Sequence, residues 1–315
     1  MLSARVTAVT LGPTPDTRIA LGRSGLSVAP LGWGMWHLAG TDAAGARLRV
    51  EAALETGCQL FDTADVYGYR RGSGFGDAEA LLGAVLRAAP QLRERMVLAT
   101  KAGIDPRVPY DSSPAYLVAA CEASLRRLGV ERIDLWQIHR PDLLAHPAEV
   151  AAVFERLQAA GKIRAAGVSN YSAAQFEALA RHVGPGLASV QNEFSALVIG
   201  GLEDGTLDAA MGYGAGVLAW SPLAQGRLVR TPEEGGEPAR TAAVIAALDT
   251  IAARAGVSRS AVAYAWVMAH PARPVPLIGS QNPARIREAA QAFAVHMTRE
   301  EWYRILVAAR GRPLP

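Results

Sequence analysis

Short apolar runs alternate along this chain with longer stretches in which apolar residues recur every three or four positions. The short runs predict strands, and the longer stretches predict helices with one apolar face. After residue 27 this alternation repeats eight times. The predicted strands lie within residues 27–35, 58–65, 95–103, 132–142, 163–170, 187–194, 216–224 and 275–280. The helices that follow them are predicted within 44–57, 77–89, 113–129, 147–162, 172–183, 202–212, 240–256 and 282–294.

Eight strand–helix units with apolar strands favour a parallel sheet closed into an α/β barrel, the (β/α)8 or TIM barrel. An open doubly wound sheet of this length would normally divide into two domains. Residues 18–30 read as an N-terminal hairpin that closes the barrel floor, and two extra helices are predicted at 258–270 and 297–309. We expect a loose N-terminal leader over residues 1–17 and a single TIM-barrel catalytic domain over 18–315.

The composition adds limits on location and partners. The chain is 50% hydrophobic and 19% charged, with a formal net charge of +3 and no basic block, so we expect no nucleic-acid partner. The longest uncharged stretch, 209–226, contains four glycines, and no signal-peptide pattern precedes the domain, so we expect no membrane association. Cys58 and Cys121 lack metal-ligand spacing and suggest free thiols in a reducing cytoplasm.

Polar residues stand at the predicted carboxyl ends of the strands, where TIM-barrel enzymes place their chemistry. The second strand leads to Asp62 and Tyr67, the third to Lys101 and the fourth to His139. Lys101 is one of only two lysines among 32 basic residues, and lysine, unlike arginine, readily enters proton chemistry. Each residue alone also has a structural explanation, but four on three consecutive strands indicate a reaction site.

This set suits proton donation to an oxygen atom that is becoming negative. A phenol has a pKa of about 10, which an adjacent ammonium lowers, and a carboxylate holds that ammonium charged. A histidine can orient a carbonyl or share its proton. The sequence has no metal-ligand motif and no Ser–His–Asp or Cys–His spacing, so we expect no metal. The missing nucleophile suggests hydride from a bound cofactor.

The same segments resemble motifs of the aldo-keto reductase superfamily. In order they read FDTADVYG, VLATKAG, ERIDLWQIHRPD, GKIRAAGVSN, VQNEFSAL, LAWSPLAQGRL and LIGSQNPARIREA, and the match extends from about Arg18 to the end. The chain looks closest to bacterial oxidoreductases of poorly defined substrate. The resemblance implies a catalytic tetrad of Asp62, Tyr67, Lys101 and His139, and substrate contacts from Trp36, Tyr67 and His139.

The resemblance also implies the cofactor NADP(H). The residues expected to bind it are Gly34, Met35, Ser169, Asn170, Gln191, Trp220, Ser221, Pro222, Leu223, Gly226, Ser280, Asn282, Arg285 and Glu288. Among them Asn282 suits a helix N-cap, with Pro283 as the first helical residue. Arg285 would contact the 2′-phosphate. Gly279 and Ala289 depart from the lysine and asparagine of many relatives, so NAD stays an alternative.

We therefore expect reduction of an aldehyde or ketone to an alcohol, with Tyr67 as general acid and a small carbonyl or sugar as substrate. Alternatives are a sugar or alcohol dehydrogenase working oxidatively, a Schiff-base lyase using Lys101, and a channel-associated subunit with slow turnover.

The GSGFG segment at 72–76 is not a dinucleotide fingerprint. We interpret it as a substrate loop, with Arg70 and Arg71 beside the substrate. The sequence leaves the oligomeric state open.

Overall fold

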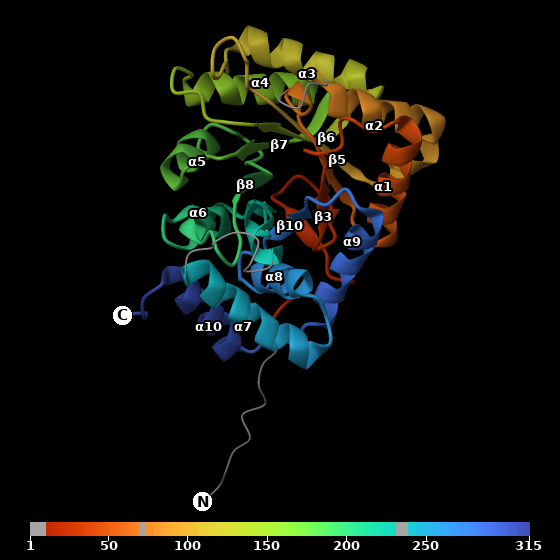
Figure 1. Ribbon diagram of the computed structural model, residues 1–315. Helices are drawn as coiled ribbons and strands as arrows, with labels where there is room; N and C mark the ends of the chain where they lie inside the picture. The colour runs from red at the N-terminus through yellow and green to blue at the C-terminus, as the bar shows by residue number, and fades with distance from the viewer. Residues whose placement is uncertain (1–10, 70–73, 231–238) are drawn as a thin grey trace, which may run out of the picture.

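The computed structural model describes residues 11–69, 74–230 and 239–315. Eight parallel strands close into a barrel in which the last strand pairs with the first, so the predicted fold class is confirmed (Figure 1). Around the barrel the strands are β3 (Gly32–Gly34), β4 (Leu60–Asp62), β5 (Val97–Ala102), β6 (Ile133–Ile138), β7 (Ile163–Ser169), β8 (Ser189–Glu193), β9 (Gly216–Trp220) and β10 (Val275–Ile278).

Helices cover the outside of the barrel and follow one another in chain order (Figure 1). The first six are α1 (Ala43–Glu55), α2 (Asp77–Ala88), α3 (Pro114–Leu128), α4 (Pro147–Ala159), α5 (Ala173–Ala180) and α6 (Thr206–Tyr213). The later ones are α7 (Ala239–Ala255), α8 (Arg259–Met268), α9 (Pro283–Glu288) and α10 (Arg299–Arg310). Short 3₁₀ segments lie at η2 (Pro90–Arg95), η3 (Gly200–Leu202), η4 (Ala224–Val229) and η6 (Ala289–Ala294).

The helix that covers the barrel between β9 and β10 is α8, whereas the sequence pattern assigned this place to the residues of α7. All residues of α8 from Ala261 to Met268 are buried, and the helix contacts β10. Helix α7 packs instead against α10 and the outer side of α8, as Figure 1 shows. Two helices are thus additional, as expected, but they are α7 and α10.

The predicted hairpin is present as β1 (Ile19–Leu21) and β2 (Leu26–Val28), paired antiparallel. Its apolar side chains cluster with residues of the barrel interior such as Leu60, Leu135 and Leu218. A Cβ at Gly22 would lie 2.9 Å from the backbone of Ala188, so only glycine permits this close approach. The hairpin therefore closes the amino-terminal end of the barrel. Leu11, within the expected loose leader, forms an isolated bridge with Met297.

No single helix in the described residues is long and apolar enough to cross a membrane. The consecutive helices α7 and α8 reach that length and apolarity only together, and the chain bends by 102° between them. Cys58 and Cys121 are free and buried, which confirms the expected thiols. Burial raises the pKa of the Cys58 thiol to about 12 and that of the Cys121 thiol to about 12.

Candidate active site

The four predicted catalytic residues lie together at the carboxyl ends of β4, β5 and β6. Asp62 is the last residue of β4, and Tyr67 lies in the turn that follows it. Lys101 lies near the end of β5, and His139 directly follows β6 and donates its backbone N–H to the Ala102 carbonyl at 2.7 Å. Parallel neighbours end at the same height, so the pairing of β4 with β5 and of β5 with β6 brings these side chains together.

Lys101 is the centre of the group. Its ammonium nitrogen donates to Asp62 Oδ2 at 2.5 Å and to the Thr63 carbonyl at 2.8 Å. The same nitrogen lies 5.1 Å from the centre of the Tyr67 ring, and the Tyr67 and His139 rings meet edge to face at 5.7 Å. Asp62 and Lys101 are almost fully buried, at 2% and 1% exposure. A buried ion pair thus lies directly beside the phenol.

The protonation states follow from burial and from this ion pair. Burial works against the Lys101 charge, but Asp62 and Tyr67 outweigh it, and the pKa of Lys101 is raised. Burial raises the pKa of Tyr67 above its usual value, and the Lys101 charge lowers it in part, as expected of an adjacent ammonium. Burial, together with the charge on Lys101, holds the pKa of His139 well below its usual range. The site therefore holds a charged lysine, a protonated phenol and a neutral imidazole.

Two glutamine side chains donate hydrogen bonds to the other carboxylate oxygen of Asp62. Gln191 Nε2 donates to Asp62 Oδ1 at 2.9 Å, and Gln137 Nε2 donates to the same oxygen at 3.3 Å. The amide nitrogen of Gln191 thus binds Asp62, and its expected contact with the cofactor amide stays a prediction. Gln137 was not predicted. A signal was present, because Gln137 precedes His139 by two positions and alternate residues of a strand face the same side.

A second polar network lies at the ends of β7, β8 and β9. Ser169 Oγ donates to the Gln191 carbonyl at 2.8 Å and accepts from Asn170 Nδ2 at 2.9 Å. Asn170 Nδ2 also donates to the His139 carbonyl at 2.9 Å, and its Oδ1 accepts from Trp220 Nε1 at 3.1 Å. The half-buried Trp220 indole is therefore fixed in orientation, and the network contacts the backbone of His139.

Left-handed backbone is concentrated at this rim. Among the described non-glycine residues, positive φ occurs at Asn170, Ser221, Ala224, Gln225 and Arg273, and the first four follow β7 or β9. Such conformations are costly for side chains other than glycine and tend to persist at binding sites. The loop from Ser221 through Pro222 and Leu223 to Gly226, which we expected to hold the cofactor, belongs to this strained region.

The remaining predicted cofactor residues surround β10 and β3. Asn282 caps α9, accepting from the Ala284 N–H at 2.9 Å, with Pro283 as the first helical residue, as expected. The Ser280 hydroxyl accepts from the Asn282 N–H at 3.2 Å. The side chain of Arg285 is exposed on α9, and Glu288 ends that helix. At β3, Gly34 ends the strand, Met35 is buried, and Trp36 is 52% exposed and stacks on His37.

A buried acidic cluster behind the tyrosine turn was not predicted. Asp65 is 1% exposed and neither of its carboxylate oxygens has a partner among the described residues, while its N–H donates to the Lys101 carbonyl at 3.0 Å. Burial raises the pKa of Asp65 well above its usual range. The neighbouring Glu79 is paired with Arg127.

Arg70 and Arg71, predicted beside the substrate, lie outside the described residues.

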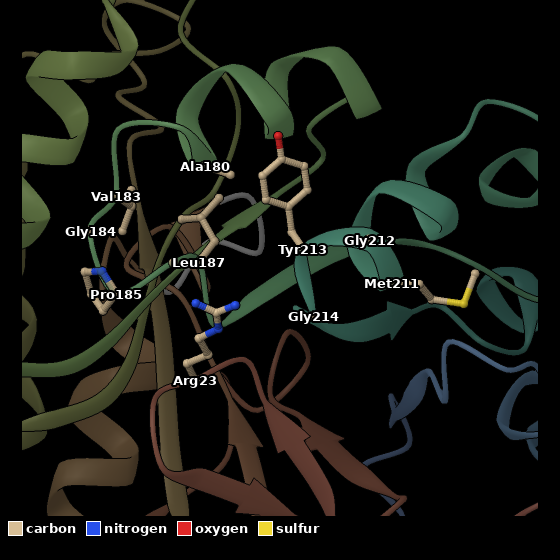
Figure 2. A pocket seen from close by; sticks show the side chains of 11 residues that line it. Arg23, Ala180, Val183, Gly184, Pro185, Leu187, Met211, Gly212, Tyr213 and Gly214 are labelled. Atoms are coloured by element: carbon tan, nitrogen blue, oxygen red, sulfur yellow. The ribbon is translucent and has the colours of Figure 1, made fainter.

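A pocket of about 390 Å³ lies at the amino-terminal end of the barrel, opposite the predicted catalytic residues (Figure 2). It is lined by Arg23 of the hairpin and by the segments 183–187 and 211–214, which lead into β8 and β9. None of the predicted site residues lines it. In the part of the chain that the structure describes, no three His, Cys, Asp or Glu side chains form a group suited to a metal ion.

Known proteins with this sequence pattern settle the family. The model of the aldo/keto reductase family matches residues 30–308, which is most of the chain. This chain belongs to the aldo/keto reductase family. Members of the family are oxidoreductases that typically use a nicotinamide cofactor, so this aldo/keto reductase is an enzyme of that class.

Relatives of this aldo/keto reductase match it over almost their whole length. A protein named 6-dehydroglucose reductase from Novosphingobium aromaticivorans is 53% identical, over 96% of this chain and 99% of its own. A protein of the same name from Agrobacterium fabrum is 36% identical, over 94% and 98% of the two chains. A crystal structure of a thermostable aldo-keto reductase with the inhibitor epalrestat has a TM-score of 0.78 at 22% identity, covering 93% and 99%, and supports the fold.

Proposed function

We propose that this enzyme is an NADPH-dependent reductase of a sugar aldehyde, and that its substrate is 6-dehydroglucose. The substrate is supported by the 53% identical relative of that name, whose full length this chain matches. The chemistry is supported by one observation above all, the buried Lys101–Asp62 pair beside the Tyr67 phenol. Reduction of the aldehyde at C6 gives the primary alcohol of glucose.

Tyr67 is the proton donor in this proposal. A reduced nicotinamide bound at the rim would supply the hydride for the aldehyde carbon. The C=O double bond becomes a C–O single bond, and the oxygen takes the phenolic proton of Tyr67. Lys101 stabilises the resulting phenolate, Asp62 balances the lysine charge, and the neutral His139 orients the carbonyl oxygen. The Schiff-base alternative is disfavoured because Lys101 is held as an ammonium, which is not nucleophilic.

The residues at the rim fit a nicotinamide cofactor. The Ser169 hydroxyl and the Asn170 amide suit a carboxamide, and the fixed indole of Trp220 offers a flat face to a flat ring. The strained backbone at Ser221 and Ala224 is consistent with a loop shaped by a ligand. These residues would hold the cofactor and keep its ring next to Tyr67 and His139.

Arg285 selects NADPH over NADH in this proposal. Its exposed guanidinium has no partner among the described residues and stands one turn into α9, near the Asn282 cap. Arg285→Ala should weaken NADPH binding by about 1–3 kcal/mol, the range for a hydrogen bond between charged groups, and leave NADH binding almost unchanged. Arg287→Ala, on the same helix but paired with Glu55, is the control. Equal losses for the two cofactors, measured by fluorescence titration, would contradict the assignment.

The decisive test is reduction of 6-dehydroglucose by the purified enzyme, followed by NADPH absorbance. Wild type should reduce it, and Tyr67→Phe should lose about 10²–10⁴-fold in kcat, the usual worth of general acid catalysis, while binding NADPH nearly as before. If Tyr67→Phe keeps its turnover within a few-fold of wild type, Tyr67 is not the acid. If wild type instead oxidises alcohols with NADP⁺ faster than it reduces aldehydes, at the ratio of NADPH to NADP⁺ found in cells, the oxidative alternative holds.

A further inference from the structure

A cleft of about 290 Å³ opens beside the tetrad, and of its lining residues only Asn170 and Trp220 have been given a role. It lies at the carboxyl ends of β6 to β9 and is lined by Arg140, the segment 170–172, Asn192, Glu193, Asp204 and Trp220, with Gly200 and Gly201 at its edge. Arg140 directly follows His139 in the chain, and Asn170 donates to the His139 carbonyl. The cleft therefore lies next to His139.

Two polar groups in this cleft lack partners. The half-buried guanidinium of Arg140 makes no hydrogen bond or ion pair with any other residue that the structure describes. Asn192 Nδ2 donates to the Tyr171 carbonyl at 2.8 Å, which fixes the amide, while its Oδ1 is buried without a partner. An unpaired buried polar atom costs about 1–3 kcal/mol, which applies to Asn192 Oδ1, so a ligand that donates to this oxygen is favoured.

The charges of the lining identify the kind of ligand. Among the described residues of the lining, Arg140 is the only cation, whereas Glu193 and Asp204 supply two carboxylates. One oxygen of each carboxylate already has a partner, since Glu193 accepts from Gln225 and Asp204 accepts from the Thr206 N–H. A phosphate or carboxylate would meet net negative charge here. A hydroxyl group instead accepts from arginine and donates to an amide or carboxylate oxygen, which is what these groups require.

We propose that this cleft binds the hydroxyl-bearing body of the sugar, with Arg140 and Asn192 as specificity-determining residues that reject aldehydes without hydroxyls. This inference rests on the proposed function, because it places the aldehyde carbon of the sugar at Tyr67. Asn170 and Trp220 form the border between the sugar and the nicotinamide. The Arg140 charge also lowers the pKa of both Tyr67 and His139, which agrees with a position close to the reacting atoms.

The test compares two six-carbon aldehydes, 6-dehydroglucose and hexanal, of which only the sugar carries hydroxyl groups and a second carbonyl, at C1. The ratio of kcat/KM for the sugar to kcat/KM for hexanal should fall on the order of 10- to 100-fold in Arg140→Met, and also in Asn192→Leu, because a hydrogen bond to a charged or buried group is lost. Arg140→Lys, which keeps the charge but not the fork, should lie between. Arg95→Met removes an exposed arginine before β5, far from the cleft, and should leave the ratio unchanged.

The outcomes separate this inference from the proposed function. An unchanged ratio in Arg140→Met, or a loss that appears only as weaker NADPH binding, overturns the sugar cleft and assigns the cleft to the cofactor. Glucose tests the cleft without turnover, as an inhibitor of hexanal reduction that should weaken at least about 10-fold in Arg140→Met. If glucose behaves so but 6-dehydroglucose is not reduced, the named substrate is wrong and the cleft stands. If glucose inhibits the reduction of neither hexanal nor 6-dehydroglucose by wild type, the cleft is wrong.

Discussion

At the scale of single residues, the two lysines of the chain show what a buried ammonium does. Lys162 lies at the surface in an ion pair with Glu122, where an arginine could serve equally well. Lys101 is buried, and its compact ammonium contacts both Asp62 and the Thr63 carbonyl while leaving room at the Tyr67 ring. Guanidinium is planar, forked and longer, so it does not fit this space.

Lys101→Arg should therefore fold and lose most of its turnover, whereas Lys162→Arg should be close to wild type in both respects. Lys101→Met should lose at least as much activity, and it also leaves the Asp62 charge buried, at a cost of about 3–5 kcal/mol in stability. Circular dichroism checks folding and steady-state kinetics checks turnover. Near wild-type reduction by folded Lys101→Arg would mean that the lysine is incidental.

The pH dependence of residual activity in Lys101→Met gives a second readout. Lys101 lowers the pKa of Tyr67, which burial has raised. Without the ammonium, the pKa of Tyr67 rises further, so the phenol keeps its proton to higher pH. The decline of reduction with rising pH should accordingly move upward relative to wild type. A decline at the same pH would show that another group controls it.

At the scale of elements, the pattern of apolar positions located the helices but exchanged the places of α7 and α8. Helices α7 and α8 follow each other directly, and each has enough apolar residues to cover a strand. The sequence AVAYAWVM in α8 is apolar on every side, which is typical of a helix buried on all faces. Apolar residues on all faces of a helix, and not only their spacing along the sequence, therefore predict that α8 packs against the barrel.

Helix packing yields a prediction from two helical glycines. A Cβ at Gly83 in α2 would lie 2.2 Å from the Arg127 backbone carbonyl oxygen of α3, while at Gly212 in α6 no atom lies within 4 Å. Gly83→Ala should destabilise the protein by about 1–3 kcal/mol through overpacking, because backbone cannot move aside as a flexible side chain can. Gly212→Ala should be neutral or stabilising by up to about 1 kcal/mol. Urea denaturation measures both. Equal effects would show that α2 and α3 can separate at little cost.

At the scale of the whole molecule, parallel strands explain how far the sequence could predict the site. Strand-end residues share one end of a closed barrel whatever the helix details, so Asp62, Lys101 and His139 could be placed together from strand positions. The pairing of Gln191 with Asp62 and the unpaired state of Arg140 could not. Both features depend on how side chains from segments far apart in the sequence contact one another in the folded protein. They also depend on which polar groups remain without a hydrogen-bond partner there.

The barrel also separates stability from chemistry, since the hairpin closes one end and the tetrad lies at the other. Leu21 of β1 is fully buried, and its Cδ2 would lie 2.7 Å from a Cβ at Gly216, so it fills the floor tightly. Leu21→Ala should lower the free energy of unfolding by about 2–5 kcal/mol through lost burial and a cavity. Leu48→Ala, at an exposed position of α1, should change it by about 0.5 kcal/mol or less.

The same Leu21→Ala protein should keep its KM, kcat and NADPH affinity within about twofold at temperatures where it is folded. The reason is that residues at the amino-terminal ends of TIM-barrel strands support stability, whereas those at the carboxyl-terminal ends support catalysis. Urea denaturation gives the stability, and kinetics at low temperature gives the activity. A tenfold change in KM or in cofactor binding in the folded variant would show that the floor and the active site are coupled through the barrel interior. In that case the residues between them, such as Leu60 and Leu135, would be the path to examine.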